Sequence, residues 1–196
     1  NALTYHLRHV SADRAEDRTP YLVHRIDKDT SGVMIVAKNE IAQARLARQF
    51  FDHSTERLYE ALVWGDFEED QGTITGHIAR SLQDRKIFAV FPDESQGRHA
   101  VTHFRVMERF HYVTLVECRL ETGRTHQIRV HFSHIRHPLF GDETYGGKAI
   151  LRGTTFSRYR QFVENCFRIL PRQALHARTL GIVHPSSGEK MHFQTE

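Results

Sequence analysis

Cysteine and long apolar runs are both scarce in this sequence, and each absence excludes a class of protein. The two cysteines, Cys118 and Cys166, lie far apart and outside any paired metal-ligand spacing. We expect them to be reduced thiols, as in cytoplasmic proteins. The longest strictly apolar run extends only from Val33 to Ala37, whereas a membrane-spanning helix needs about 20 residues. With no basic-then-apolar leader at its start, the sequence predicts a cytoplasmic protein without a membrane partner.

Lysine is also scarce, because arginine supplies 22 of the 27 basic residues, and the net charge is only +3. The planar guanidinium grips phosphate with two hydrogen bonds and stacks on bases, which an ammonium group cannot do. The preference for arginine therefore favours a polyanionic partner slightly. A GC-rich genome or a surface rich in ion pairs would explain the same composition.

The length and the balance of residues are those of one globular domain. A chain of 196 residues that is 39% hydrophobic and 26% charged can bury a core of its own. Strand-like and helix-like segments intermix without regular alternation, which predicts an α+β fold with a mixed sheet rather than a doubly wound one. We expect residues 1–196 to form a single domain.

Strands are predicted where β-branched and aromatic residues alternate or cluster between turn residues. These segments are 21–25, 33–38, 57–65, 72–77, 87–90, 100–109, 112–120 and 174–185. Segments 100–109 and 112–120 are close enough to pair as a hairpin. Residues 138–147 are expected to form a loop.

Helices are predicted at three places from apolar residues at helical spacing. One covers about 40–52 with Asn39 as its N-cap, a second runs from a cap at Thr125 to about Ile135, and a third covers about 159–167. The apolar face of the first helix is expected to contain Ile41, Ala44, Ala47 and Phe51. That of the second is expected to contain Ile128, Phe132 and Ile135.

Two kinds of site that motifs suggest are not supported by their spacing. The stretch "GDETYGGK" has glycines at 141 and 146 but lacks the lysine and hydroxyl residue of a phosphate-binding P-loop. Histidines 131, 134 and 137 recur every three residues, but no matching carboxylate or cysteine set accompanies them. We therefore predict no metal site.

The stretch "HRIDKDTSG" (24–32) places Asp27 among cations at the start of an apolar segment. A carboxylate withdrawn from water would be neutralised unless a guanidinium pairs with it and aims it, and Arg129 is a candidate partner. Asp27 and Asp29 could instead act as an acid–base pair on glycosides, although such pairs usually come from distant segments. A third possibility is that Asp27 only stabilises a turn.

The motifs resemble those of the RluA/RluD-type pseudouridine synthases. "HRIDKDTSG" followed by "VMIVAK" is similar to the catalytic motif of that family, and "LYEALVWG" to its tyrosine strand. "TGRTHQIRVH" with "HPLFGDETYGG" resembles the third motif, and "LHARTLGIVHP" the closing strand. The resemblance implies the pseudouridine synthase fold, with a mostly antiparallel sheet, flanking helices and a central cleft.

The resemblance also implies roles for individual residues. Asp27 would act on the ribose of a uridine while the base detaches, turns over and reattaches through carbon. It would do so by attacking the sugar carbon or by removing a sugar proton. Arg129 would pair with Asp27, and Tyr59 would lie against the uracil ring and could assist removal of the C5 proton. No metal or organic cofactor is expected. An Arg129→Met variant is expected to keep the fold and lose activity.

The expected partner is structured RNA, with large-subunit ribosomal RNA as the first candidate and tRNA as the second, and the protein is expected to be a monomer. Arg25 would occupy the space of the flipped nucleotide. The full set of expected RNA-binding residues is Arg25, Lys28, Arg80, Arg85, Lys86, Arg124, His126 and Arg136.

The sequence also departs from the family pattern in places, and other functions are possible. Arg136 stands where the family often has glycine, so that turn could differ. An upstream strand and an S4-type RNA-binding domain, which many relatives carry, are expected to be absent. A non-catalytic RNA-binding module and a carboxylate-pair hydrolase are the alternative functions.

Overall fold

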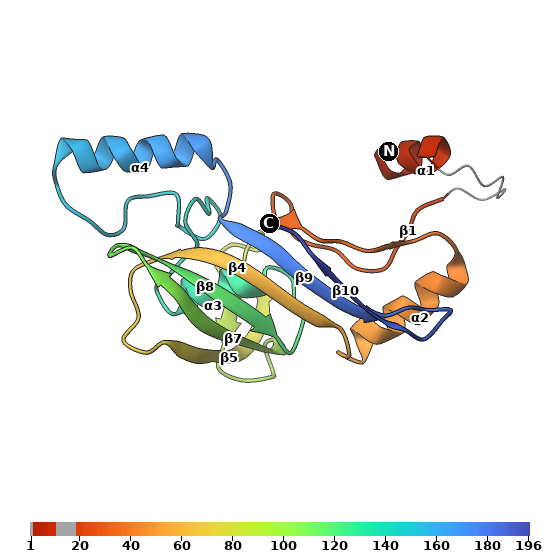
Figure 1. The fold of residues 1–196 in the computed structure, drawn as a ribbon. Coiled ribbons are helices and arrows are strands. Elements are labelled where there is room, and N and C mark those ends of the chain that lie inside the picture. Colours follow the sequence, from red (N-terminus) through yellow and green to blue (C-terminus); the bar gives the residue numbers. More distant parts are fainter. Residues whose placement is uncertain (1, 11–18) are drawn as a thin grey trace.

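Helices lie at both ends of a long, twisted sheet and against its inner part (Figure 1). The computed structural model describes residues 2–10 and 19–196, with side chains for residues 2–6 and 19–196. Within these residues the helices are α1 (Ala2–Val10), α2 (Glu40–Phe51), α3 (Gln127–His134) and α4 (Ser157–Ile169). Helices α2 and α4 are at opposite ends of the sheet.

The main sheet has the strand order β10-β9-β4-β8-β7-β5-β6, and β2 pairs with β9 as an additional strand. Its strands are β2 (Ser31–Gly32), β4 (Glu56–Trp64), β5 (Gln71–Arg80), β6 (Phe88–Phe91), β7 (Arg98–Arg109), β8 (Val113–Leu120), β9 (Leu175–Val183) and β10 (Lys190–Gln194). A second, two-stranded sheet joins β1 (Tyr21–Leu22) to β3 (Val36–Ala37). Among the described strands, only β2 and β9 pair in parallel. The predicted α+β fold with a mostly antiparallel sheet is confirmed.

Several predicted elements are confirmed with small shifts of their ends. Strands β7 and β8 form the expected antiparallel hairpin, and β4, β9 and α4 cover the segments assigned to them. Residues 138–147 form a loop, as expected. Strand β10 and helix α1 were not anticipated. Strand β10 forms because it continues the sheet on the outer side of β9, a position that its own five residues do not reveal.

The apolar run from Val33 to Ala37 is not the continuous strand that its composition predicts. Strand β2 pairs with β9, whereas β3 pairs with β1, so residues 33–35 carry the chain from one sheet to the other. Only Ala37 in the run is buried, and the side chain of Met34 is 39% exposed. The strand predicted over 21–25 is shortened for the same reason, because its partner β3 has only two residues.

Helix α2 begins as predicted, but the prediction of its apolar face is wrong. Asn39 caps the helix through a hydrogen bond from the backbone N–H of Ala42 to its Oδ1, at 2.8 Å. Ile41 and Phe51 are 68% and 75% exposed, whereas Leu46 is buried. The packed face follows the spacing of Ala42, Leu46 and Phe50 because α2 rests on β9 and β3.

Helix α3 is the central element of the fold, and its start differs from the prediction. The residue before it is His126, which has a left-handed backbone with φ +56 and makes no side-chain cap, so the predicted cap at Thr125 is wrong. The six residues from Gln127 to Phe132 are all buried, because α3 packs on β5, β6 and β7. Ile128 and Phe132 therefore lie in the core as expected, but so do the polar residues between them.

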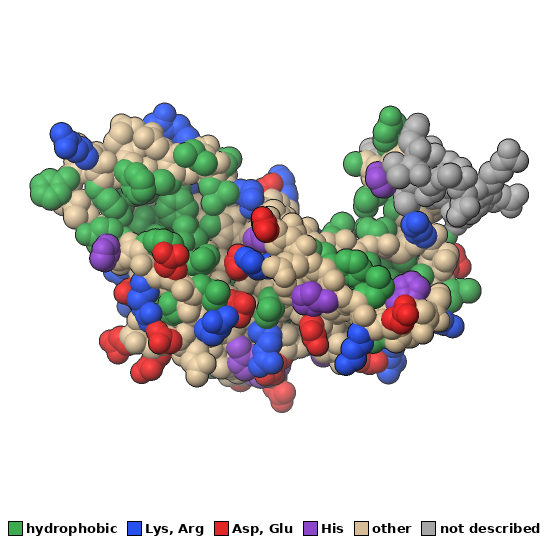
Figure 2. Space-filling model, in the orientation of Figure 1, with side chains coloured by type: hydrophobic (Ala, Val, Ile, Leu, Met, Phe, Trp, Pro, Cys, Tyr) green, Lys and Arg blue, Asp and Glu red, His purple; other side chains and the backbone are tan. Residues whose placement is uncertain are grey.

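The far end of the sheet is covered by α4. Tyr159 and Val163 of α4 pack with Trp64 and Phe140, while Phe162 is 64% exposed. Figure 2 shows apolar side chains gathered in the hollow between α4 and the sheet. This end of the molecule is separated by the sheet from the segments that contain α2.

Candidate active site

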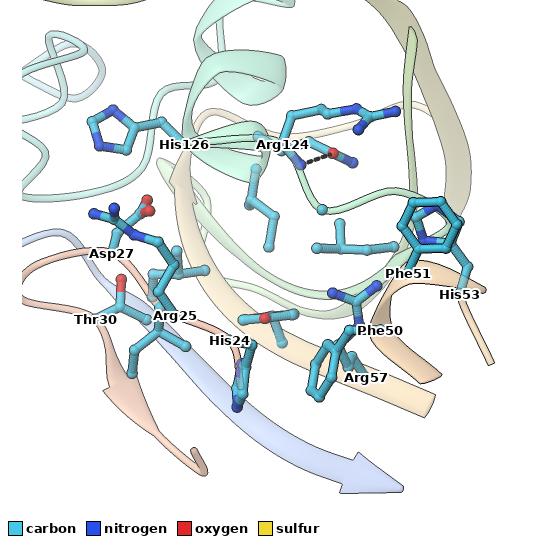
Figure 3. Close-up of a pocket in the computed structure, with 17 residues that line it drawn as sticks. His24, Arg25, Asp27, Thr30, Phe50, Phe51, His53, Arg57, Arg124 and His126 are labelled. Atoms are coloured by element: carbon cyan, nitrogen blue, oxygen red, sulfur yellow. Dashed lines mark hydrogen bonds between the residues drawn. The ribbon is translucent and has the colours of Figure 1, made fainter. Parts of the chain in front are cut away.

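A cavity of about 520 Å³ lies between the loop that follows β1, the end of α2, strand β4 and the start of α3 (Figure 3). It brings together residues from the Asp27 motif, the tyrosine strand, the stretch "TGRTHQIRVH" and the start of the closing strand. Its lining is His24, Arg25, Ile26, Asp27, Thr30, Phe50, Phe51, His53, Arg57, Tyr59, Leu120, Gly123, Arg124, His126, Gln127, Ile128 and Leu175. The site is thus assembled from segments more than a hundred residues apart in the chain.

Asp27 begins a tight turn in the loop that enters this cavity. The backbone N–H of Thr30 donates to the carbonyl of Asp27 at 3.0 Å. Asp29 takes the left-handed conformation, with φ +67, which aspartate tolerates better than most residues. Asp29 does not line the cavity, whereas Asp27 does. The arrangement therefore does not support the paired-carboxylate reading.

Two side chains next to β9 hold this loop in place. The amide of Gln173 donates to the carbonyl of Lys28 at 2.6 Å and to the hydroxyl of Thr30 at 3.2 Å. The guanidinium of Arg172 donates to the carbonyl of Asp29 at 3.1 Å and to Ser31 Oγ at 3.2 Å. Neither Arg172 nor Gln173 was identified from the sequence, because their neighbouring residues do not indicate a contact with a loop more than 140 residues away.

Arg129 pairs with two carboxylates, one at a shorter distance than the other. Its Nε and Nη2 donate to both oxygens of Asp142, at 2.7 and 2.9 Å, while Nη1 lies 3.5 Å from Asp27 Oδ2. The predicted contact between Arg129 and Asp27 is therefore present, but Asp142 is the tighter partner. The Asp142 side chain is fully buried, that of Arg129 is 6% exposed and that of Asp27 is 17% exposed. Only Asp27 of the two carboxylates lines the cavity.

Asp142 is held by the loop predicted over 138–147. Its Oδ1 accepts the backbone N–H groups of Thr144 and Tyr145 at 3.0 and 3.1 Å. Burial would lower the pKa of Arg129, but the hydrogen bonds and charge of Asp142, with the charge of Asp27, raise it above the ordinary value. Asp142 belongs to "GDETYGG", the stretch with P-loop-like glycines. Its place in that motif was the only feature of the sequence that could have identified Asp142 as a site residue.

A ring of polar contacts connects α3 with the same loop. The phenol of Tyr145 lies 2.8 Å from His126 Nδ1, and its ring is 5.0 Å from the guanidinium carbon of Arg129. Burial raises the pKa of Tyr145 to about 12, so the phenol stays protonated at neutral pH. Burial lowers the pKa of His126, and the charge of Asp27 opposes that shift. A neutral His126 can accept the phenolic hydrogen.

Tyr59 lies on β4, within the segment predicted as a strand, and lines the cavity. Burial raises the pKa of its phenol; the charge of Arg57 opposes this shift, and the charge of Asp27 adds to it. The phenol is therefore neutral near pH 7. Such a group is suited to van der Waals contact with a base and to donating a hydrogen bond, and less suited to removing a proton.

His24, Phe50 and Arg57 form a stack at the other side of the cavity. The rings of His24 and Phe50 are 4.4 Å apart with an interplanar angle of 15°, and the guanidinium carbon of Arg57 is 5.6 Å from the Phe50 ring centroid. His24 Nε2 accepts the backbone N–H of Ile35 at 3.0 Å. Burial first, and then the charge of Arg57, lower the pKa of His24 to about 4, so the ring is a neutral acceptor.

The predicted RNA-binding residues fall into two groups. Arg25, Arg124 and His126 line the cavity, whereas the other five do not. Figure 3 shows the Arg25 side chain extending toward Asp27. Arg124 Nε donates to the carbonyl of His99 at 3.0 Å, which fixes its direction.

The residues outside the cavity occupy different parts of the surface. Arg80 lies at the end of β5, its guanidinium 5.0 Å from the Phe88 ring, with Arg85 and Lys86 in the exposed turn that follows. Lys28 is exposed on the loop. Arg136 follows α3 with φ +65, so it takes the left-handed conformation expected of the glycine it replaces. Among the described residues no group of metal-ligating side chains is found.

Comparison with known proteins assigns the chain to a family. The family profile for RNA pseudouridylate synthase matches residues 2–134, more than half of the chain. A protein from Chlorobaculum parvum named as an uncharacterized RNA pseudouridine synthase is 46% identical over 98% of this chain and 59% of its own length. The ribosomal large subunit pseudouridine synthase D of Zymomonas mobilis is 43% identical over the whole of this chain and 58% of its own length. The chain thus spans less than three fifths of these relatives.

Solved structures give the same answer for the fold. Human RNA Pseudouridylate Synthase Domain Containing 1 superposes with a TM-score of 0.72 at 27% identity, covering 91% of this chain and 69% of the human chain. Human RNA Pseudouridylate Synthase Domain Containing 4 superposes with a TM-score of 0.76 at 23% identity, covering 99% of this chain and 77% of the other, and this likeness concerns the fold alone. The matched residues 2–134 contain Asp27 and Tyr59, which line one cavity, and Arg129, whose Nη1 lies 3.5 Å from Asp27 Oδ2. The chain belongs to the RNA pseudouridylate synthase family.

Proposed function

We propose that this chain is the catalytic part of an RNA pseudouridine synthase that isomerises specific uridines in structured RNA. One observation carries the proposal. Asp27 and Tyr59, from two separate segments, line one cavity, and Arg129 of a third segment lies 3.5 Å from Asp27, in a chain of the RNA pseudouridylate synthase family. We also propose that residues 1–196 act as a single catalytic domain.

The reaction requires that the uridine leave its stack before any side chain reaches it. Flipping a base costs a few kcal/mol, and Arg25, exposed beside the cavity, is suited to fill the vacated space and contact phosphate. Asp27 then acts on the ribose as the bond from C1′ to N1 breaks. The base turns over, C5 bonds to C1′, and the C5 proton is lost while N1 gains one.

Arg129 and Asp142 contribute by fixing the carboxylate that reacts. Because Asp142 occupies Nε and Nη2 of Arg129, only Nη1 is directed to Asp27. That geometry leaves one positive charge near Asp27 without burying its carboxylate in a tight pair. Asp27 is therefore aimed but remains available to the sugar.

For Tyr59 we propose contact with the uracil ring rather than proton removal. Burial raises the pKa of its phenol above the ordinary value, so the phenolate needed for a base is rare at neutral pH. An aromatic ring can stack on any base because every base has a π-face. A Tyr59→Phe variant should then keep most of the activity, whereas Tyr59→Ala should lose it.

Large-subunit ribosomal RNA is the proposed substrate. The relative from Zymomonas mobilis and one from Vibrio cholerae, 44% identical over 98% of this chain, are both named ribosomal large subunit pseudouridine synthase D. Because ribosomal RNA is reached in the cytoplasm, we propose that location, and we propose a monomer. No helix in the described residues is both long and apolar enough to cross a bilayer.

The proposal is tested by mapping pseudouridines in total RNA from cells with and without the protein, and in the same RNA treated with purified protein. The expected result is a small set of uridines in large-subunit ribosomal RNA that are modified only when the protein is present. If the modified uridines occurred only in tRNA, the proposed activity would stand and the proposed substrate would be wrong. No site at all would overturn the activity.

Variants separate the enzyme from its alternatives. Asp27→Asn should abolish isomerisation and largely retain RNA binding, whereas a non-catalytic RNA-binding module has no turnover to lose. Asp29→Ala is the matched control, because Asp29 lies on the same turn but outside the cavity. A carboxylate-pair hydrolase would require both carboxylates, so normal product formation by Asp29→Ala would exclude it.

A further inference from the structure

The cavity extends well beyond the groups that would act on the uridine. Figure 3 shows Asp27 and His126 at one side of it and Phe50, Phe51 and Arg57 at the other. All of them line the same continuous space of about 520 Å³. The second side has no role in the reaction as described above, so its chemistry requires a separate explanation.

Arg57 is a charged residue of this second side, and no carboxylate of the described residues pairs with it. Within the described part of the chain its side chain makes no hydrogen bond and no ion pair, and its Nε is buried without a partner. The residue as a whole is half-buried. Buried cations of proteins are usually paired, because withdrawing an unpaired charge from water is costly. Arg129, by contrast, pairs with two carboxylates, Asp27 and Asp142.

The guanidinium is nevertheless held in one place. Phe50 packs against it at 5.6 Å and is itself stacked on His24. On another side lies Gly123, where an added Cβ would be 3.1 Å from Arg57 Nη1, so the missing side chain leaves room for the guanidinium. The charge of Arg57 acts on the pKa values of both His24 and Tyr59. Arg57 is thus a fixed positive group that an incoming anion would meet without rearrangement.

Its position along β4 indicates which anion this is. Arg57 and Tyr59 are two residues apart on the strand, a separation of about 7 Å, and both line the cavity. If Tyr59 contacts the uracil, an anion at Arg57 is about one nucleotide away from that base. A guanidinium binds a phosphate with two hydrogen bonds in its own plane.

We propose that Arg57 binds the phosphodiester group that joins the target uridine to its neighbour in the RNA. The identity of the anion as RNA rests on the proposed function, whereas the anion-binding character of Arg57 rests on its own surroundings. Arg57 is accordingly a binding residue that orients the flipped nucleotide, and it takes no part in bond making.

The test compares Arg57→Gln and Arg57→Lys with Arg160→Gln. Arg160 lies on α4, its side chain is 75% exposed, and it pairs with Glu164, so its substitution removes the same charge away from the cavity. Dissociation constants for large-subunit ribosomal RNA are measured over a range of salt concentrations, together with thermal unfolding of each variant. Arg57→Gln should weaken binding about tenfold or more and reduce the salt slope by about one. Arg57→Lys should keep the slope, and Arg160→Gln should match the wild type.

A second measurement identifies the phosphate. A stem-loop carrying a mapped uridine is made with one phosphodiester beside it replaced by a neutral methylphosphonate. Wild type should lose about as much affinity for this RNA as Arg57→Gln loses for the natural one, and the variant should lose nothing more. The proposal would be overturned if, for the phosphate on either side of the uridine, the loss of affinity from the methylphosphonate simply added to the loss from Arg57→Gln. An unchanged salt slope in Arg57→Gln would overturn it as well.

The two proposals fail in different ways. If wild-type protein forms no pseudouridine, the proposed function is wrong, and the salt slope of RNA binding still decides whether Arg57 contacts a phosphate. If wild type is active and Arg57→Gln has unchanged affinity, KM and salt slope, only the assignment of Arg57 is wrong.

Discussion

At the scale of single residues, the site depends on a guanidinium shared between two carboxylates. The motif that contains Asp27 and the helix that contains Arg129 were identified from the sequence, and the structure brings them to 3.5 Å. Asp142 was not identified as a partner, although it makes the closer contacts. This changes the expectation for Arg129→Met. That variant would leave the fully buried Asp142 without its counter-charge, so we now expect it to lose stability as well as activity.

Asp142→Asn should be strongly destabilising. It leaves the buried Arg129 without a carboxylate at Nε and Nη2, and breaking a buried ion pair typically costs about 3–5 kcal/mol. The free energy of unfolding is measured by urea denaturation. Glu164→Gln is the control, since it breaks the exposed pair with Arg160 and should cost about 0.5 kcal/mol or less. Equal costs for the two variants would show that Asp142 is not essential to the buried pair.

His24 should make stability depend on pH. Burial and the charge of Arg57 lower its pKa from 6.5 to about 4 in the folded chain, so the unfolded chain binds more protons between these values. The free energy of unfolding should therefore fall as pH decreases from about 6.5 to about 4, with the contribution of His24 complete above 6.5.

Two histidine variants check this prediction by urea denaturation across that pH range. His24→Gln should flatten part of the slope, and buried His131, whose pKa burial also lowers to about 4, should account for more of it. His192→Gln, at an exposed position on β10, should leave the slope unchanged. A wild-type slope that persists in full in His24→Gln would contradict the assignment.

At the scale of elements, the turn that contains Asp27 is connected to the sheet by the short strand β2. Gly32 ends that strand with φ +119 and pairs with Ala177 of β9. A Cβ at Gly32 would overlap the backbone of Ala177. Ser31 and Gly32 follow the turn that contains Asp27, and their parallel pairing with β9 fixes that loop to the core.

Gly32→Ala should therefore destabilise the protein and lower its activity more than a glycine substitution that only strains the backbone. Gly188→Ala is the matched control, because Gly188 also has a positive φ, +76, but nothing lies within 4 Å of an added Cβ. Backbone strain alone should cost about 1–2 kcal/mol, and the overlap at Ala177 should add to it. Urea denaturation and pseudouridine formation measure both effects, and similar losses in the two variants would contradict this account.

At the scale of the whole molecule, the strand order joins distant segments around one cavity. Strand β4 lies between β8 and β9, so Tyr59 and Arg57 are placed near the loop held by Gln173. The net charge is only +3, so the proposed binding of RNA would depend more on the local arrangement of arginines around the cavity than on the total charge.

RNA affinity should fall steeply with salt, because each phosphate contact releases bound counterions. The slope of log Kd against log salt should be about 0.7–0.9 for each phosphate contacted. It is measured with large-subunit ribosomal RNA between about 50 and 200 mM salt. A flat response would argue against a surface that follows the RNA backbone.

The sequence by itself determined the family, the α+β class and the candidates Asp27, Tyr59 and Arg129, because motifs and periodicity are properties of neighbouring residues. The tertiary structure decided what each of them contacts. The packed face of α2, the pairing of Arg129 with Asp142, the hold of Gln173 on the loop and the free charge of Arg57 all depend on side chains that meet across the fold. Such contacts follow from how the strands are ordered, which no local pattern of residues encodes.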